Sequence, residues 1–77
     1  MMTKQELLME YSIQDIIEYI VKDLRIEYDK AMQLFYNSKT FDKLTDVDTG
    51  LYLESSAYVY TIFQDEINFG NIIQAEI

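Results

Sequence analysis

The centre of the chain, from Ala31 to Phe63, reads AMQLFYNSKTFDKLTDVDTGLYLESSAYVYTIF. Apolar residues are grouped in it at the three- and four-residue spacings of a helix, and it contains most of the aromatic rings of the chain. Residues 45–50, TDVDTG, are dense in turn-forming residues. We therefore expect helices on both sides of one central loop.

This loop carries acidic residues at alternate positions. Asp46 and Asp48, with Glu54 further on, offer the alternating carboxylates of a calcium-binding loop. Gly50 comes one position early for such a loop and Glu54 closes it too soon, so we interpret the aspartates as turn formers and expect a positive φ at Gly50. A cation or ligand sensor that uses residues 46–54 is kept as an alternative, and we expect no cofactor and no metal.

A helix is expected on the C-terminal side of the loop. Ser55 is placed to cap a helix over residues 56–68. Its buried face should consist of Val59, Ile62, Phe63 and Ile67, which fit a period of 3.6 residues. A strand over residues 58–63 is the alternative, because this segment is β-branched and aromatic, but it has no second strand to pair with. Gly70 should end the helix and leave residues 71–77 as a flexible or docking tail.

A long helix is expected at the N-terminal end. Thr3 and Glu6 match a capping box, which places the helix start near Lys4. One apolar stripe at helical period follows: Ile13, Ile16, Ile17, Ile20, Val21 and Leu24. The stripe predicts a helix over residues 4–24.

The apolar stripe changes phase after Leu24, because Ala31, Leu34 and Phe35 form a new set. This change predicts a tight turn and a second helix over residues 28–38, with one continuous bent helix over residues 13–38 as the alternative.

Thr40 is expected to cap a short helical turn over residues 41–44. The expected fold is therefore all-α: a single domain, residues 1–77, with a small bundle of three main helices (about 4–24, 28–38 and 56–68) and the helical turn at 41–44.

Composition limits both the stability and the chemistry of the chain. It has 77 residues, an apolar share of 49%, and neither cysteine nor histidine. A core this small is marginal without disulfides or a structural metal, so we expect self-association into a homo-oligomer. There is no long uninterrupted apolar run, and we expect a cytoplasmic protein without a membrane span. Because the usual nucleophile and base pairs need His or Cys, we expect no enzyme and no catalytic residue.

Charge is distributed unevenly along the chain. The net charge is −8, and all six basic residues precede Leu44. Direct binding of nucleic acid needs Lys and Arg to neutralise phosphates, so we expect none. An acidic chain instead suits a protein partner with a basic surface, or, as the runner-up, it mimics nucleic acid and inhibits a DNA- or RNA-binding protein.

Seven tyrosines and four phenylalanines are the other unusual feature. Several tyrosines lie off the predicted core stripes, and partly exposed aromatic rings commonly anchor protein interfaces. The equally weighted alternative is that these rings cover the core and keep their hydroxyl groups in water. The candidate partner-binding residues are Tyr36, Tyr52, Tyr60, Asp46, Asp48, Glu54 and Asp65.

A resemblance covers about 30 residues in this region. The residues that carry it are Phe35-Tyr36-Asn37-Ser38, Thr40, Leu44, Asp46, Thr49-Gly50-Leu51-Tyr52, Ser55 and Tyr58-Val59-Tyr60. They resemble a group of short, acidic, helical bacterial proteins of unknown function, sometimes encoded beside toxin-like or mobile-element genes. The resemblance implies a small helical protein without catalytic residues, and an antitoxin-like or accessory role. The sequence thus favours a non-enzymatic protein–protein interaction module.

Overall fold

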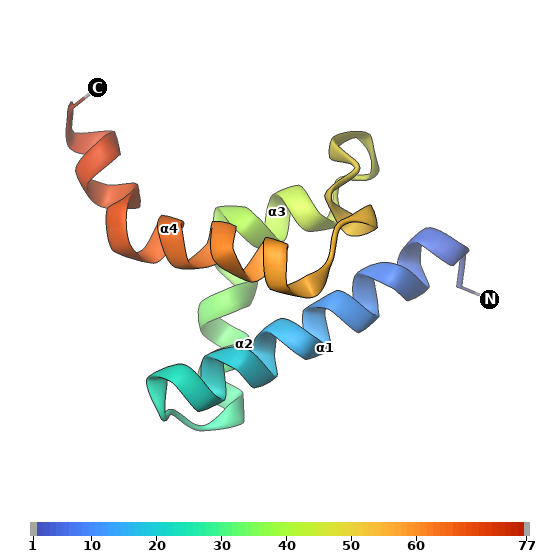
Figure 1. Ribbon diagram of the computed structural model, residues 1–77, viewed down its shortest axis with the longest axis horizontal. Helices are drawn as coiled ribbons and strands as arrows, with labels where there is room; N and C mark the ends of the chain where they lie inside the picture. The colour runs from blue at the N-terminus through green and yellow to red at the C-terminus, as the bar shows by residue number, and fades with distance from the viewer. Residues whose placement is uncertain (1, 77) are drawn as a thin grey trace.

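The computed structural model is all-helical over the backbone of residues 2–76, and it describes the side chains of residues 2–69. Four α-helices and two short 3-10 turns follow one another: α1 (Lys4–Leu24), α2 (Tyr28–Tyr36), α3 (Lys39–Thr45), η1 (Val47–Thr49), η2 (Leu51–Leu53) and α4 (Ser56–Glu76). Helix α1 packs against both α2 and α4, and α3 packs against α4 (Figure 1). No described helix is both long and apolar enough to cross a membrane.

The start and the end of α1 follow from local sequence. The expected capping box is confirmed: the Glu6 amide donates to the Thr3 hydroxyl, and the Glu6 carboxylate accepts from the Thr3 amide. The helix ends because Arg25 takes a left-handed conformation, with φ of 54°. Helices α1 and α2 are therefore separate, as the change of phase predicts, and not one bent helix.

The core lies where α1, α2, α3 and α4 meet. Its fully buried residues are Ile16, Ile17, Ile20, Ala31, Phe35, Leu44, Val59 and Phe63. The apolar stripes of the sequence account for most of this set, but not for its edges. Leu24, Leu34 and Ile67, which the periodicity places in the core, are exposed because each lies at the margin of the packed region.

Helix α3 differs from its prediction. It spans seven residues instead of the four of the expected turn, and α2 ends at Tyr36 instead of residue 38. Ser38, not Thr40, is its N-cap: the Ser38 hydroxyl accepts from the Phe41 amide and donates to the Phe35 carbonyl. Thr40 is instead buried inside the helix. The prediction of a cap at Thr40 is therefore wrong.

The central loop and the start of α4 are as expected. Gly50 has a φ of 68° and separates η1 from η2. The Ser55 hydroxyl accepts from the Tyr58 amide, which confirms Ser55 as the cap of α4. Residues 58–63 are helical and not a strand.

The predicted end of α4 is wrong. The helix runs through Gly70 to Glu76, because a glycine inside a helix costs only about 1 kcal/mol and does not by itself end it. The segment 71–77, expected as a flexible or docking tail, is thus part of α4 up to Glu76. The prediction that this segment docks depends on side chains that lie outside the described residues.

Candidate partner-binding site

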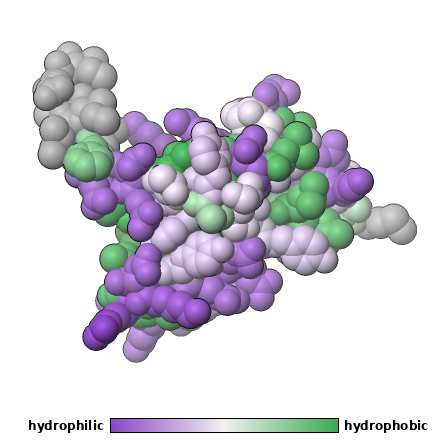
Figure 2. All heavy atoms as spheres, in the orientation of Figure 1, coloured by the Kyte–Doolittle hydropathy of each residue, from purple (hydrophilic) through white to green (hydrophobic). Residues whose placement is uncertain are grey.

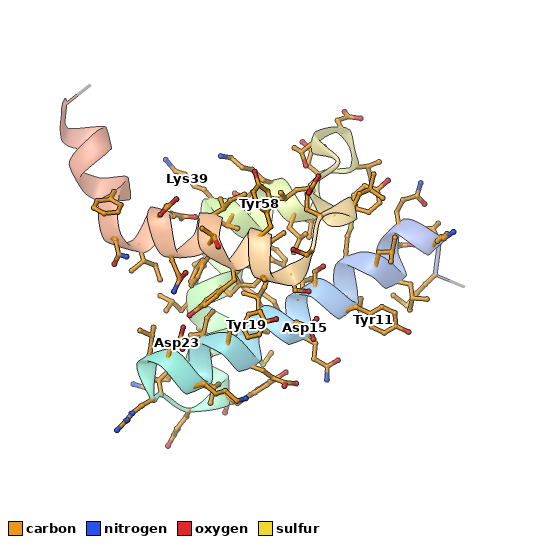
Figure 3. The ribbon with its side chains drawn as sticks, viewed as in Figure 1. Tyr11, Asp15, Tyr19, Asp23, Lys39 and Tyr58 are labelled. Atoms are coloured by element: carbon orange, nitrogen blue, oxygen red, sulfur yellow. The ribbon has the colours of Figure 1, made fainter. Side chains whose placement is uncertain are left out.

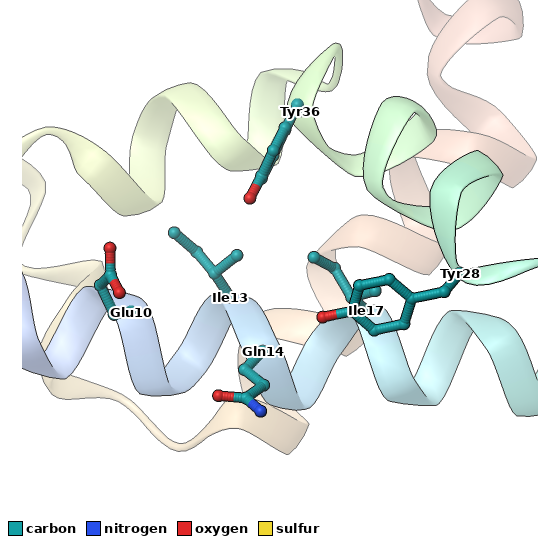
Figure 4. A pocket seen from close by; sticks show the side chains of 6 residues that line it. All are labelled: Glu10, Ile13, Gln14, Ile17, Tyr28 and Tyr36. Atoms are coloured by element: carbon teal, nitrogen blue, oxygen red, sulfur yellow. The ribbon is translucent and has the colours of Figure 1, made fainter.

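A depression lies between α1 and α2 (Figure 4). It holds about 180 Å³. Six residues line it: Glu10, Ile13, Gln14, Ile17, Tyr28 and Tyr36. In Figure 4, the side chain of Tyr36 points from α2 toward Ile13 and Ile17 on α1.

A second and larger depression, of about 410 Å³, adjoins the first. The two share Glu10, Ile13 and Tyr36, and the second adds Met2, Glu6, Met9, Phe41 and Thr45. The shared residues place the two depressions side by side along α1, with α2 and α3 as their other wall. We call the two together the Tyr36 groove.

Tyr36 lies midway along the groove on its α2 side, where it lines both depressions, and is held there by its neighbours. It lies at the last position of α2, and 43% of its surface is exposed. Its ring packs on Phe41, with 4.9 Å between centroids, and Phe41 meets the buried Phe35 edge-to-face at 5.6 Å. A half-exposed aromatic ring fixed to the core loses little conformational freedom on binding, which is typical of an interface anchor.

The charge on the groove is negative. Among the described residues that line it, the charged ones are Glu6 and Glu10, both on α1 and both exposed. Hydrogen bonds from the Thr3 backbone and side chain hold the pKa of Glu6 below its usual range. Glu6 and Glu10 are four residues apart, about one helical turn, so the two carboxylates lie along the same edge of the groove.

The α3 wall of the groove is fixed by a distant residue. Glu66 of α4 accepts hydrogen bonds from the amides of Lys39 and Thr40, both 2.8 Å long, and from the Thr40 hydroxyl at 2.7 Å. Partial burial opposes the charged form of Glu66, but these hydrogen bonds outweigh it and lower its pKa. The Ser38 hydroxyl accepts a hydrogen bond from the Phe41 amide. The first three amides of α3, those of Lys39, Thr40 and Phe41, therefore all have hydrogen-bond partners.

The opposite face of the molecule is a seam between α1 and α4. Tyr60 donates to Asp23 at 2.7 Å, and Ser56 donates to Asp15 at 2.8 Å. Burial and the Asp23 carboxylate raise the pKa of the Tyr60 hydroxyl. Figure 3 shows Tyr11, Asp15, Tyr19 and Asp23 in a row along α1 on this side, and Figure 2 shows that the face has a pale middle, neither strongly polar nor apolar. The polar groups of the seam bind one another, which indicates a structural role.

The structure does not gather the seven predicted site residues into one surface. Tyr36 and Tyr60 line different depressions that share no residue. Tyr52, in η2, and Tyr60 are half-buried and pack against the core. The predicted acidic residues Asp46, Asp48, Glu54 and Asp65 are exposed on the central loop and on α4.

The acidic loop does not form a cation cage. Asp46 instead accepts a hydrogen bond from the Asp48 amide and caps η1. Among the residues whose side chains are described, no three acidic groups lie close enough together to hold a metal ion.

Most of the groove lies outside the predicted site residues. Met9, Glu10 and Ile13 are not among them, although Glu6, Glu10 and Ile13 have the spacing of one helical face. That spacing was the available signal. No family model, curated protein or solved structure matches this chain.

Proposed function

We propose that this protein is a non-enzymatic protein–protein interaction module, with an antitoxin-like or accessory role, that binds a basic partner through the Tyr36 groove. The observation that carries the proposal is the groove itself, in which a fixed and half-exposed tyrosine stands over apolar residues beside two carboxylates. Its apolar floor supplies affinity, and the carboxylates supply preference for a cationic partner.

The antitoxin-like part of the proposal rests on the resemblance of residues 35–60 to short acidic bacterial proteins. The proposed cytoplasmic location rests instead on the short apolar runs of the sequence and its lack of cysteine. Nucleic-acid mimicry, the runner-up, differs in its dependence on salt. A mimic would lose affinity steeply as ionic strength rises and would compete with nucleic acid, whereas an aromatic groove retains most of its affinity.

Photo-crosslinking in the native host tests this function. A photoreactive phenylalanine analogue placed at Tyr36 should capture one partner in stoichiometric yield. The same analogue at Tyr58, which is 53% exposed on α4, is the matched control and should capture none. Equal capture at both positions, or capture at Tyr58 alone, would remove the groove from the interface.

We also propose that the chain self-associates through exposed apolar residues of α4. Ile67 and Phe69 are 44% and 52% exposed, and Ile67 joins Leu24 and Phe63 around a depression of about 140 Å³. A second copy of the chain, which presents the same apolar residues, is the expected occupant.

A further inference from the structure

We propose that the Tyr36 groove receives an amphipathic α-helix of the partner, with apolar residues on one face and Lys or Arg along one flank. This inference rests on the proposed function and deepens it by naming the chemistry of the bound segment.

The walls of the groove favour a helix over an extended segment. Both walls are α-helices, whose backbone groups are hydrogen-bonded within the helices themselves. Residues 2–76 contain no strand to which an extended peptide could add. A bound strand would therefore leave its own amides without partners beside apolar side chains, whereas a helix satisfies them internally.

The length of the groove sets the length of the bound helix. Lining residues lie on α1 from Glu6 to Ile17, and Met2, which precedes the helix, extends the groove at one end. From Glu6 to Ile17 the helix rises about 16 Å at 1.5 Å per residue, so with the extension at Met2 the groove accommodates a helix of three to four turns, up to about 15 residues.

The apolar residues that line the groove determine the sequence pattern expected of the bound helix. Met2 is exposed and Ile13 and Phe41 are half-buried, so these three residues offer the apolar contacts, over a floor made by the buried Met9 and Ile17. Matching apolar residues are expected in the partner at positions i, i+4, i+7 and i+11. Met2 and Met9, which are flexible and polarisable, let the groove adapt to the shapes of these side chains.

The two rims differ in charge, which orients the bound helix. The α1 rim carries Glu6 and Glu10, while Tyr28, Tyr36 and Thr45 on the other rim are uncharged. Cations are therefore expected on the flank that faces α1, at i and i+4, and neutral polar residues on the other flank.

The test uses a designed 15-residue peptide with leucines at positions 2, 6, 9 and 13, lysines along one flank, neutral polar residues elsewhere, and a fluorescent label. Binding is measured by fluorescence anisotropy, and the conformation of the bound peptide is determined from its ¹³C chemical shifts. A scrambled peptide of identical composition and a peptide with Glu in place of Lys are the controls. We expect the designed peptide to bind as a helix and the two controls to bind at least tenfold more weakly.

Two charge-reversed variants of the protein locate the binding. Glu10→Lys changes the groove rim, and Asp65→Lys makes the same change of net charge on the outward face of α4. We expect Glu10→Lys to raise the Kd of the designed peptide at least tenfold, and Asp65→Lys to raise it less than twofold. Equal effects of the two variants, equal binding of the scrambled peptide, or a non-helical bound peptide would each overturn the inference.

The outcome is separable from that of the proposed function. If the analogue at Tyr36 captures a partner and the peptide does not bind, the groove is an interface for a segment of another kind. If neither binds, the groove is not an interface at all.

Discussion

Glu66 connects two helices that are far apart in the sequence. Its carboxylate accepts three hydrogen bonds from Lys39 and Thr40, and so joins the start of α3 to the middle of α4. A carboxylate at this place also interacts favourably with the positive end of the short helix.

Replacing Glu66 by Gln should lower the free energy of unfolding by about 1.5–3 kcal/mol, the range for hydrogen bonds to a charged group. The amide of Gln replaces one of the two acceptor oxygens with an NH2 group, which is a donor, where three donors converge. Urea unfolding at pH 7, followed by circular dichroism, measures the loss. Asp65→Asn, an exposed neighbour on α4, is the control and should change stability by less than about 0.5 kcal/mol.

The stability of the wild-type chain and that of Glu66→Gln should also depend differently on pH. Because folding lowers the pKa of Glu66, its carboxylate stabilises the folded state fully above its ordinary value of 4.5, and this contribution is lost as pH falls through the lowered pKa. The wild-type chain should therefore lose more stability than Glu66→Gln as the pH falls below 4.5. Parallel curves for the two proteins would show that the carboxylate makes no net contribution.

Tyr60 is the corresponding residue on the seam between α1 and α4. Its hydroxyl donates to Asp23, so Tyr60→Phe should lower stability by about 0.5–1.5 kcal/mol, measured as a decrease in the urea midpoint. Tyr58→Phe removes an exposed hydroxyl from the same helix and should leave the midpoint unchanged. The interpretation of the seam as structural fails if both variants behave alike.

At the scale of elements, the turn at Gly50 is set by backbone conformation. A Cβ atom added to Gly50 would meet no atom within 4 Å, so the cost of Gly50→Ala is the cost of its positive φ alone. We expect a loss of about 1–2 kcal/mol. Gly50→Asn should lose less, because Asn tolerates the left-handed conformation. Thermal unfolding of both variants gives the comparison, and an equal loss would contradict this account.

Local sequence predicted those elements whose ends are fixed by neighbouring residues. The capping box at Thr3, the turn after Leu24, the glycine at position 50 and the cap at Ser55 all act within a few residues of the chain. Helix α3 could be predicted only in part in this way. Its cap at Ser38 is local, but its first two amides bind a carboxylate 26 or 27 residues away, and no local spacing records that contact.

At the scale of the whole molecule, six aromatic rings form an unbroken series through the core. In order they are Tyr36, Phe41, Phe35, Phe63, Tyr60 and Tyr19, with neighbouring centroids 4.9 to 6.2 Å apart. The series runs from the Tyr36 groove to the seam between α1 and α4. The sequence indicated that tyrosines would matter, but only the packing separates Tyr36, which faces the groove, from Tyr60, which binds Asp23.

The sequence could not predict the groove either, because the groove also depends on how the helices pack in three dimensions. Its walls come from α1, α2 and α3, and its shape depends on how these helices cross. Periodicity identifies the faces of one helix but not the distance to the next.

Added salt should strengthen the proposed self-association. Copies of a chain with a net charge of −8 repel one another, so added salt should promote the proposed association through Ile67 and Phe69. Static light scattering at 50 and 500 mM salt measures this, and Ile67→Lys with Phe69→Lys should give a monomer at both concentrations. A mass that falls with added salt would contradict an apolar interface.

The contact from Glu66 also has a consequence for the order in which a newly made chain folds. The amides of Lys39 and Thr40 leave the ribosome before the carboxylate that binds them, and helix formation in so short a segment is unfavourable without its partner. Helix α3, and with it one wall of the groove, is therefore expected to form only after residue 66 is available. A chain that stops before residue 66 would lack this contact, and with it the finished α3 wall of the groove.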